Sequence, residues 1–210
     1  MPLVGSCSIW EEMPNAVTSK IDSVRHDVMN YKVERTENFF SGIKNQILEK
    51  IARGIPGAQS VRPYLHRWRG VKIGSSVWIG YDAIIETAKP HLVTIKDGAT
   101  IGIRSIIIAH FRGWERPVVI EEGAFLGPGV IVLPNVVIGR GSVVAAGSVV
   151  TTSVPPMTLV QGNPAKPVAQ VGKPPSPEVS FQEFSSSLRP LRQNAREAHA
   201  TGAAIPEPSV

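Results

Sequence analysis

A branched aliphatic residue recurs at every sixth position through most of the chain between residues 71 and 155. With two interruptions the series holds for twelve positions: Ile73, Ile79, Ile85, Ile95, Ile101, Ile107, Ile120, Leu126, Val132, Ile138, Val144 and Val150. Glycine directly follows five of them, and most are followed four residues later by a small or β-branched residue. Neither the 3.6-residue period of an amphipathic helix nor the alternation of a half-buried strand describes this pattern. The period of six predicts a repeat protein built from short strands and tight corners.

The repeat predicts a mainly β fold, with a parallel β-helix domain over residues 71–168. Three short strands separated by corners form a coil of about eighteen residues with a triangular cross-section, in which the aliphatic side chains stack as internal ladders. The sequence holds about four such coils. Small residues suit the positions where the chain turns inward, and glycine suits corners that need an unusual φ or a close approach of backbones.

The two interruptions of the repeat predict loops. The first comprises residues 89–92 (KPHL) and the second residues 113–118 (GWERPV). Insertions in repeat proteins form loops on one face, and this is often the binding face. We therefore expect the chemistry of this protein near these two loops.

The regions on either side of the repeat differ from it in pattern. Residues 1–70 form a predicted N-terminal helical extension, because residues 36–53 carry apolar residues at spacings of three and four: Phe40, Ile43, Ile47 and Ile51. This helix is expected to pack over the open N-terminal end of the β-helix or against a neighbouring subunit. Residues 169–210 form a Pro- and Ser-rich C-terminal tail, expected to be poorly ordered, with room for a short helix.

Composition excludes several classes of protein. The sequence of 210 residues has no apolar stretch long enough for a membrane-spanning helix, and its start lacks the pattern of a secretory signal. The single cysteine, Cys7, permits no intrachain disulfide, which fits a reducing, cytoplasmic location. The net charge of +5 comes from scattered basic residues, so it favours a solvated surface or a phosphate-bearing co-substrate over nucleic acid.

Several segments of the sequence resemble one family of enzymes. The segments are VKIGSSVWIG, PHLVTIKDGATIGIRSIIIAH, GAFLGPGVIVLPNVVIGRGSVVAAGSVVTTSVPP and LVQGNPAK, within residues 71–168. They resemble the hexapeptide-repeat acyltransferases of the maltose, galactoside and capsule or lipopolysaccharide O-acetyltransferase type. The resemblance implies a left-handed coil, an exception to the usual right-handed crossover. It also implies acetyl-CoA or another acyl-CoA as co-substrate, and a homotrimer with active sites between subunits.

His110 is the candidate catalytic residue. It follows the strand sequence IIIA and precedes the second loop, a place where a lone histidine is more often an ordinary loop residue. Acyl transfer to a hydroxyl or amine nevertheless needs a base with a pKa near neutrality, and the family has its general-base histidine at this point. The resemblance therefore implies direct transfer in a ternary complex with His110 as base, without a covalent intermediate and without a metal.

The resemblance also implies a set of coenzyme contacts along one edge of successive coils. The matching positions are Pro128, Ala146, Thr151, Thr152 and Lys166. Lys166 has the clearest chemical rationale, because a cation beyond the last coil can meet the phosphates of the coenzyme. The other four also suit any β-helix as plain corner residues. The family often has lysine where Thr152 stands, so the sequence departs from its pattern there.

The small-molecule acceptor is expected to contact residues of the two loops and of the preceding corner: Glu86, His91, Trp114 and Arg116. Lys89 is a weaker candidate on the first loop. Two of these residues have ordinary alternatives, since Glu86 can simply mark a charged corner and Trp114 can pack its loop down.

Two other functions are compatible with a β-helix. Zinc-dependent carbonic anhydrases of this architecture need three converging histidines, whereas the repeat region holds only His91 and His110. A catalytically silent scaffold is the second alternative. It differs from an acyltransferase in being indifferent to the loss of His110.

Overall fold

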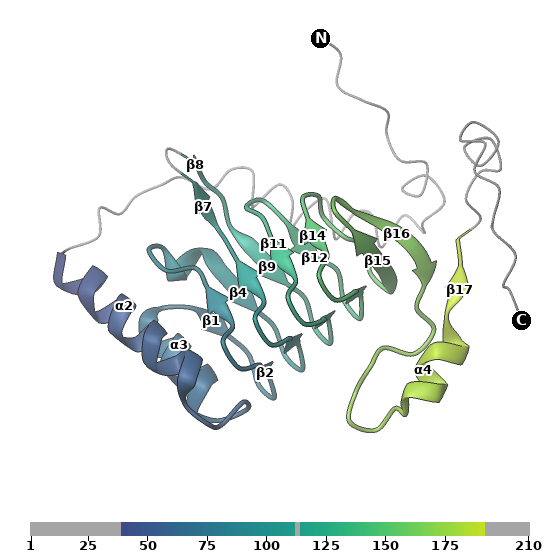
Figure 1. Ribbon diagram of the computed structural model, residues 1–210, viewed down its shortest axis with the longest axis horizontal. Coiled ribbons are helices and arrows are strands. Elements are labelled where there is room, and N and C mark those ends of the chain that lie inside the picture. The colour runs from purple at the N-terminus through teal and green to yellow at the C-terminus, as the bar shows by residue number, and fades with distance from the viewer. Residues whose placement is uncertain (1–38, 112–113, 192–210) are drawn as a thin grey trace, which may run out of the picture.

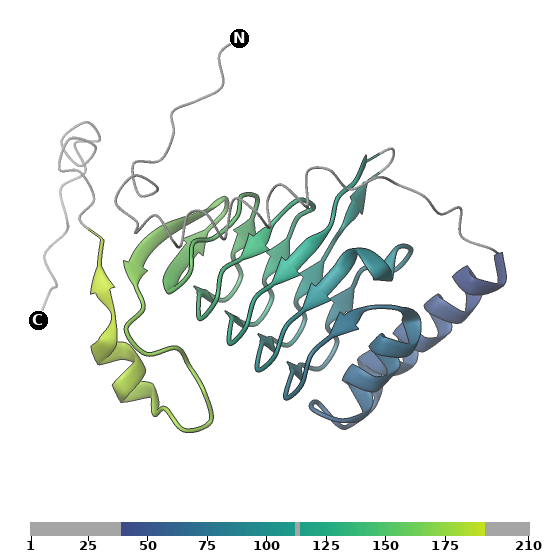
Figure 2. The same cartoon turned by 180° about the vertical axis from the view of Figure 1, so that it is seen from behind.

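The protein is described by a computed structural model that covers residues 39–111 and 114–191. The chain winds into a prism of parallel β-strands with two helices at its N-terminal end (Figures 1 and 2). None of the helices within this part of the chain is long and apolar enough to cross a membrane.

The prism has three faces, each of which stacks one strand from each successive coil. Face A contains β1 (Lys72–Ile73), β4 (Val93–Ile95), β9 (Val118–Ile120) and β12 (Val137–Ile138). Face B contains β2 (Trp78–Ile79), β5 (Thr100–Ile101), β10 (Phe125–Leu126) and β13 (Val143–Val144). Face C contains β3 (Ile84–Ile85), β6 (Ile106–Ile107), β11 (Ile131–Val132) and β14 (Val149–Val150). Three full turns thus separate β1 from β12, and β13 and β14 continue the winding, in agreement with the predicted parallel β-helix. Its left-handed sense stays a prediction.

The predicted aliphatic positions form the internal ladders. Eleven of the twelve are at most 1% exposed, and only Ile73, in the first strand, is partly buried. The strand registers place them directly above one another, as in the stack of Ile85, Ile107 and Val132 on face C. The core is therefore a continuous column of branched side chains, which each added coil extends.

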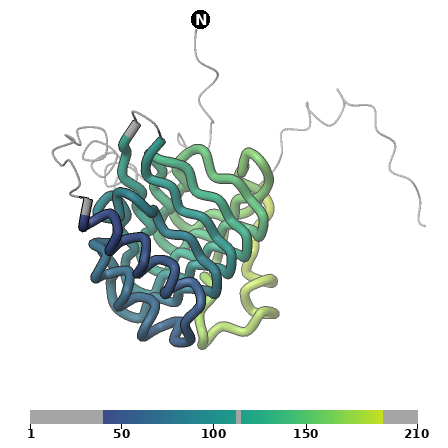
Figure 3. Tube along the Cα trace, turned by 60° about the vertical axis from the view of Figure 1, so that its left-hand side comes forward, coloured from purple at the N-terminus to yellow at the C-terminus, as the bar shows by residue number. Residues whose placement is uncertain are grey.

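The first coil is capped by the helices α2 (Phe39–Gly54) and α3 (Val61–Arg69), which lie in front of the coils in Figure 3. The helix predicted over residues 36–53 is confirmed as α2, but the side that faces the prism is not its apolar stripe. Asn45, Leu48, Glu49 and Ala52 are buried, whereas the stripe is exposed to 82% at Phe40, 41% at Ile43, 53% at Ile47 and 45% at Ile51.

The end of a parallel β-helix is itself polar. The N–H groups of one strand donate to the carbonyls of the next coil, as Gly74 does to Ile95 and Glu86 to Ile107 (2.8 Å each). The strand carbonyls of the first coil therefore need donors from outside the prism. Helix α3 supplies a guanidinium for each face: Arg67 to the Ile73 carbonyl (3.0 Å), Arg62 to Ile79 (2.8 Å) and Arg69 to Ile85 (3.0 Å).

Both predicted loops leave the prism at the same edge, between faces C and A. The first contains the 3₁₀ helix η2 (Pro90–Leu92). The second begins with a hairpin of β7 (His110–Phe111) and β8 (Trp114–Glu115), which projects from the prism (Figure 1). The two breaks in the sequence repeat therefore do mark loops on a shared edge.

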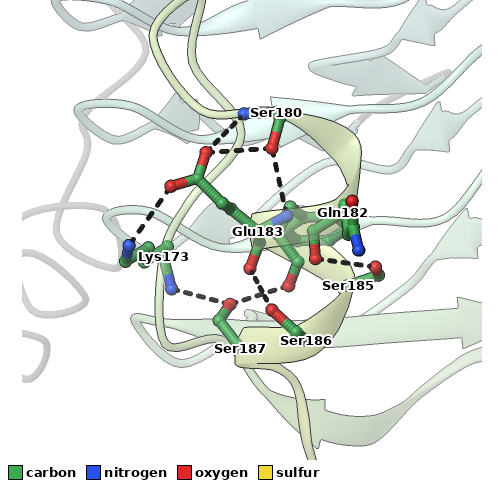
Figure 4. A network of polar contacts seen from close by, with 8 residues as sticks. Lys173, Ser180, Gln182, Glu183, Ser185, Ser186 and Ser187 are labelled. Carbon is green, nitrogen blue, oxygen red and sulfur yellow. Dashed lines mark hydrogen bonds and ion pairs between the residues drawn. The ribbon is translucent and has the colours of Figure 1, made fainter.

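Beyond the last coil, β15 (Thr158–Gly162) adds to face B and is followed by the antiparallel strands β16 (Ala165–Gln170) and β17 (Arg189–Pro190). The short helix allowed for in the tail is α4 (Phe181–Ser187). Ser180 begins it with a capping box, because its hydroxyl accepts from the Glu183 N–H (3.2 Å) while the Glu183 carboxylate accepts from the Ser180 N–H (3.0 Å) (Figure 4). Cys7 and the rest of the tail, residues 192–210, lie outside the described residues.

Candidate active site

His110 and Glu86 meet at the edge between faces C and A. Glu86 directly follows β3 in the first coil, and His110 opens the β7–β8 hairpin that leaves the second coil. The Nδ1 atom of His110 lies 2.6 Å from Oε1 of Glu86. The Glu86 side chain is 1% exposed and that of His110 is 33% exposed, so the carboxylate is sealed while the imidazole still reaches solvent.

The Glu86 carboxylate is also held by the backbone. Its Oε1 accepts from the N–H groups of Ala88 (2.9 Å) and Lys89 (3.0 Å), and its Oε2 accepts from that of Ala109 (2.7 Å). These donors come from both loops that leave the edge. Glu86 therefore ties the start of the first loop to the strand end that carries His110.

The balance of these contacts keeps Glu86 ionised. Burial raises the pKa of its carboxyl group, but the close contact with His110 and the hydrogen bonds from the Lys89 and Ala109 N–H groups outweigh burial and hold the pKa below its usual value. A carboxylate at Nδ1 fixes the imidazole tautomer that carries a proton on Nδ1. Nε2 is then the nitrogen that can accept a proton, which is the arrangement a general base requires.

An ion pair joins the two loops. The Nζ atom of Lys89 lies 3.1 Å from Oε1 of Glu115, and Glu115 pairs with His110 across the hairpin. The first loop is therefore tied to the hairpin that carries His110.

The other predicted acceptor contacts lie on the same loops. His91 is half-buried in η2. Arg116 is exposed, and its backbone N–H donates to the Ala109 carbonyl (2.9 Å). Trp114 lies in β8, where it pairs with Phe111 through the backbone. Glu86 differs from them, because its carboxylate is enclosed by the donors just described.

The predicted coenzyme contacts divide between two edges of face C. Pro128 and Ala146 are exposed at the edge between faces B and C, one coil apart. Thr151 and Thr152 are exposed after β14, on the edge where His110 lies two coils earlier, and Lys166 is exposed in β16. A single protomer thus places Pro128 and Ala146 across face C from His110.

A large groove lies away from this edge, at the corners between faces A and B. It is lined by Asp97, Glu122, Arg140 and the proline-rich segment 174–177, and it does not include His110. Among the described residues no group of three His, Cys, Asp or Glu side chains is placed to hold a metal ion.

Two contributors to the site were missed from the sequence. The first is the role of Glu86 as the partner of His110. The sequence feature that could have indicated it is a carboxylate directly after the aliphatic position Ile85, one coil before the histidine. The second is α3, whose His66 and Arg69 lie at a spacing of three and so share one side of the helix. Both are buried beneath the site.

Comparison with known proteins gives a consistent picture. Residues 117–152 match the family model of the bacterial transferase hexapeptide (six repeats). A solved hexapeptide-repeat containing acetyltransferase from Vibrio cholerae O1 biovar eltor, in complex with acetyl coenzyme A, is 26% identical over 62% of this chain and 87% of its own, with a TM-score of 0.52. A maltose O-acetyltransferase from Clostridium difficile 630 is 20% identical over 70% of this chain and 96% of its own, with a TM-score of 0.48. No curated sequence matches significantly. The family model and the Vibrio cholerae structure confirm the resemblance to hexapeptide-repeat acyltransferases.

Proposed function

We propose that this protein is an acyl-CoA-dependent acyltransferase that moves an acetyl group from acetyl-CoA to a hydroxyl or amine of a sugar or other small molecule. The observation that carries the proposal is the contact of His110 with the buried, ionised carboxylate of Glu86 at the break in the repeat. The similarity to an acetyltransferase that was solved with acetyl coenzyme A supports the choice of donor.

In the proposed reaction, Nε2 of His110 accepts the proton of the acceptor hydroxyl or amine as its oxygen or nitrogen attacks the thioester carbonyl. Glu86 stabilises the imidazolium that forms. Backbone N–H groups at a corner offer donors for the tetrahedral oxyanion. When the intermediate collapses, the C–S bond breaks and the departing thiolate takes the proton back from His110, so no covalent acyl-enzyme is required.

The remaining predicted residues fit into this proposal. Pro128, Ala146, Thr151, Thr152 and Lys166 would contact the coenzyme, and His91, Trp114 and Arg116 would shape the acceptor site. Glu86 would hold the base and not the acceptor. We also propose that residues 71–168 form the acyltransferase domain between the helical extension 1–70 and the tail 169–210, and that the active protein is a cytoplasmic homotrimer.

The test is a thiol-release assay with acetyl-CoA and a panel of sugar, amino-sugar and small hydroxylated acceptors. We expect His110→Ala to lower kcat by about 10²- to 10⁴-fold, the range typical for loss of a general base. His91→Ala is the matched control on the neighbouring loop, and should mainly raise KM for the acceptor. An enzyme that turns over no acceptor, or one unaffected by His110→Ala, would indicate a scaffold.

A further inference from the structure

The cap helix α3 reaches the candidate base through the backbone of Glu86. The side chain of Arg69 is buried, with 3% of the residue exposed. Its Nη1 donates to the Ile85 carbonyl (3.0 Å) and its Nη2 to the Glu86 carbonyl (2.6 Å). The planar guanidinium therefore clamps two successive carbonyls at the point where the chain leaves β3 and turns into the site.

Glu86 has a backbone conformation that needs such support. Its φ is +22°, in a region that side-chain-bearing residues seldom adopt. Its N–H donates to the Ile107 carbonyl (2.8 Å) and its own carbonyl accepts from Arg69, so the peptide groups on both sides are fixed. This conformation turns the carboxylate inward to the Ala109 N–H and to His110.

Arg69 is itself held in place by neighbours of the cap. Its Nη1 also contacts Nδ1 of His66 (2.9 Å). Burial, helped by the nearby charge of Arg69, lowers the pKa of His66 to about 3, so this imidazole is neutral and its Nδ1 can accept from the guanidinium. The buried Glu49 carboxyl group is the opposite charge that acts on Arg69, with Arg53 also near it.

We infer that Arg69 is a positioning residue for the proposed acyl transfer: by clamping the Ile85 and Glu86 carbonyls it sets the conformation in which Glu86 holds His110. The inference rests on the proposed function, and it links the N-terminal extension directly to the base. Removing the clamp deletes no atom that touches the substrates, but it releases the Ile85 and Glu86 carbonyls and so loosens the support of His110.

The chain provides two matched controls on the same helix. Arg67 forks onto the carbonyls of Ile73 and Gly74 on face A, in the same way as Arg69 does on face C. Arg62 bridges the Ile55 carbonyl (2.7 Å) and the Ile79 carbonyl (2.8 Å) on face B. Both cap the first coil, and neither contacts Glu86. A purely structural role for the arginines would make the three equivalent in their effect on catalysis.

The experiment compares Arg69→Lys with Arg67→Lys and Arg62→Lys in the full-length protein, with acetyl-CoA and the acceptor from the panel that wild type turns over fastest. Lysine keeps the positive charge but has no fork to span two carbonyls. Rates are normalised to the folded fraction from circular dichroism. We expect Arg69→Lys to lower kcat about tenfold with KM for acetyl-CoA unchanged, since a small displacement of a catalytic group is sufficient for such a loss. The two controls should keep the wild-type kcat.

A double-variant cycle then shows whether Arg69 acts through Glu86. In the Glu86→Gln background, Arg69→Lys should lower kcat no further, because the carboxylate that Arg69 positions is already gone. If Arg69→Lys does not fold, Glu49→Gln/Arg69→Gln is the second variant. It removes the fork and both buried charges together, so no charge is left uncompensated.

The outcomes separate this inference from the proposed function. A wild-type protein without acyltransferase activity, or one indifferent to His110→Ala, would refute the proposed function. The enzyme could instead be active and dependent on His110, while Arg69→Lys and Arg67→Lys have the same kcat, or while Arg69→Lys lowers kcat as much in Glu86→Gln as in wild type. Either result would refute the role of Arg69 and leave the proposed function standing.

Discussion

At the scale of single residues, the site depends on a carboxylate that is both buried and charged. Burial alone would neutralise Glu86, and a neutral carboxylic acid could not stabilise an imidazolium. Three backbone N–H groups and His110 supply the compensation. The arrangement resembles the carboxylate–imidazole part of a catalytic triad, in which the carboxylate fixes the tautomer of the histidine and stabilises its charged form.

Replacing Glu86 by glutamine should therefore impair chemistry more than binding. Glutamine keeps the size of the side chain but lacks the negative charge. Its amide nitrogen is a donor, so it cannot accept the hydrogen bonds of the N–H groups that surround it. We expect kcat to fall about 10- to 100-fold while KM for acetyl-CoA stays within about twofold of wild type, as for loss of an interaction made mainly in the transition state. Steady-state kinetics test this. Glu115→Gln, which removes a neighbouring carboxylate that pairs with Lys89, is the control, and an effect equal to that of Glu86→Gln would contradict the assignment.

His66 should make the stability of the fold depend on pH. Its folded pKa is about 3, below its ordinary value of 6.5, so the unfolded chain binds a proton that the folded chain refuses between these values. The contribution of His66 to the free energy of unfolding is therefore fully present above pH 6.5. It is lost as the pH falls below this value, by up to about 1.4 kcal/mol per pH unit. Glu49 acts in the opposite sense: its pKa is raised in the folded protein, so its uptake of a proton as the pH falls favours the folded state. Glu86 has a lowered pKa, so its contribution to stability is lost only at more acidic pH.

Urea unfolding measured at about pH 7.5 and about pH 5.5 would show this loss in the wild type. His66→Gln is the comparison, because the glutamine oxygen can still accept from Arg69 but does not titrate. Its unfolding free energy should change less between the two pH values. An equal change in both proteins would mean that groups other than His66 determine the slope.

At the scale of elements, the corners contain glycines for two different reasons. A Cβ added to Gly102 would lie 2.5 Å from the carbonyl carbon and oxygen of Gly127 in the next coil, so this glycine is needed for close approach of backbones. Gly147 has open space around it but a φ of +69°. The same residue type therefore meets a steric requirement in one corner and a conformational requirement in another.

Alanine substitutions should separate the two reasons. Gly102→Ala forces the backbone of one coil away from the next and should cost about 3 kcal/mol or more, the upper range for overpacking. Gly147→Ala strains only its own φ and should cost about 1 kcal/mol. Thermal unfolding of both variants is the measurement. Equal losses would show that close approach adds nothing to the cost at Gly102.

Those elements that follow from local periodicity could be predicted from the sequence, and those that depend on the ends of the repeat could not. The ladder from Ile79 to Val150 and the loops at residues 89–92 and 113–118 follow from a period of six and its breaks. The packing side of α2 could not be found in this way, because hydrophobic spacing predicts burial of Ile43 and Ile47. α2 lies against α3, and α3 in turn meets the strand carbonyls of the first coil with polar groups. The need of those carbonyls for donors explains the arginines of α3, which have no counterpart in the repeat pattern.

At the scale of the whole molecule, the proposed site residues are distributed over both edges of face C. His110, Thr151 and Thr152 follow strands of this face, whereas Pro128 and Ala146 precede them. In a cyclic trimer the contacts are head-to-tail, so one edge of a subunit can meet the other edge of its neighbour. The proposed homotrimer would thereby bring a coenzyme bound along Pro128 and Ala146 of one subunit to His110 of the next.

Mixed trimers test this arrangement. His110→Ala removes the base, and Ala146→Glu places a bulky negative charge on the proposed coenzyme edge, so each variant alone should be inactive. When the two are co-expressed with different tags and mixed trimers are isolated, one of the three junctions in each trimer joins an intact His110 to an intact coenzyme edge. We therefore expect about one third of wild-type activity, from the head-to-tail contacts of a cyclic trimer.

The same experiment with His110→Ala and Glu86→Gln provides the control. His110 and Glu86 contact each other within one protomer. Every subunit of these mixed trimers lacks one of the two, so no site has an intact pair. Their activity should not exceed that of the more active parent. Recovery in the first mixture but not in the second requires a site shared between subunits. Without recovery in either, acyl transfer would have to occur within one protomer, and Ala146 could not then be a coenzyme contact for the His110 of a neighbouring subunit.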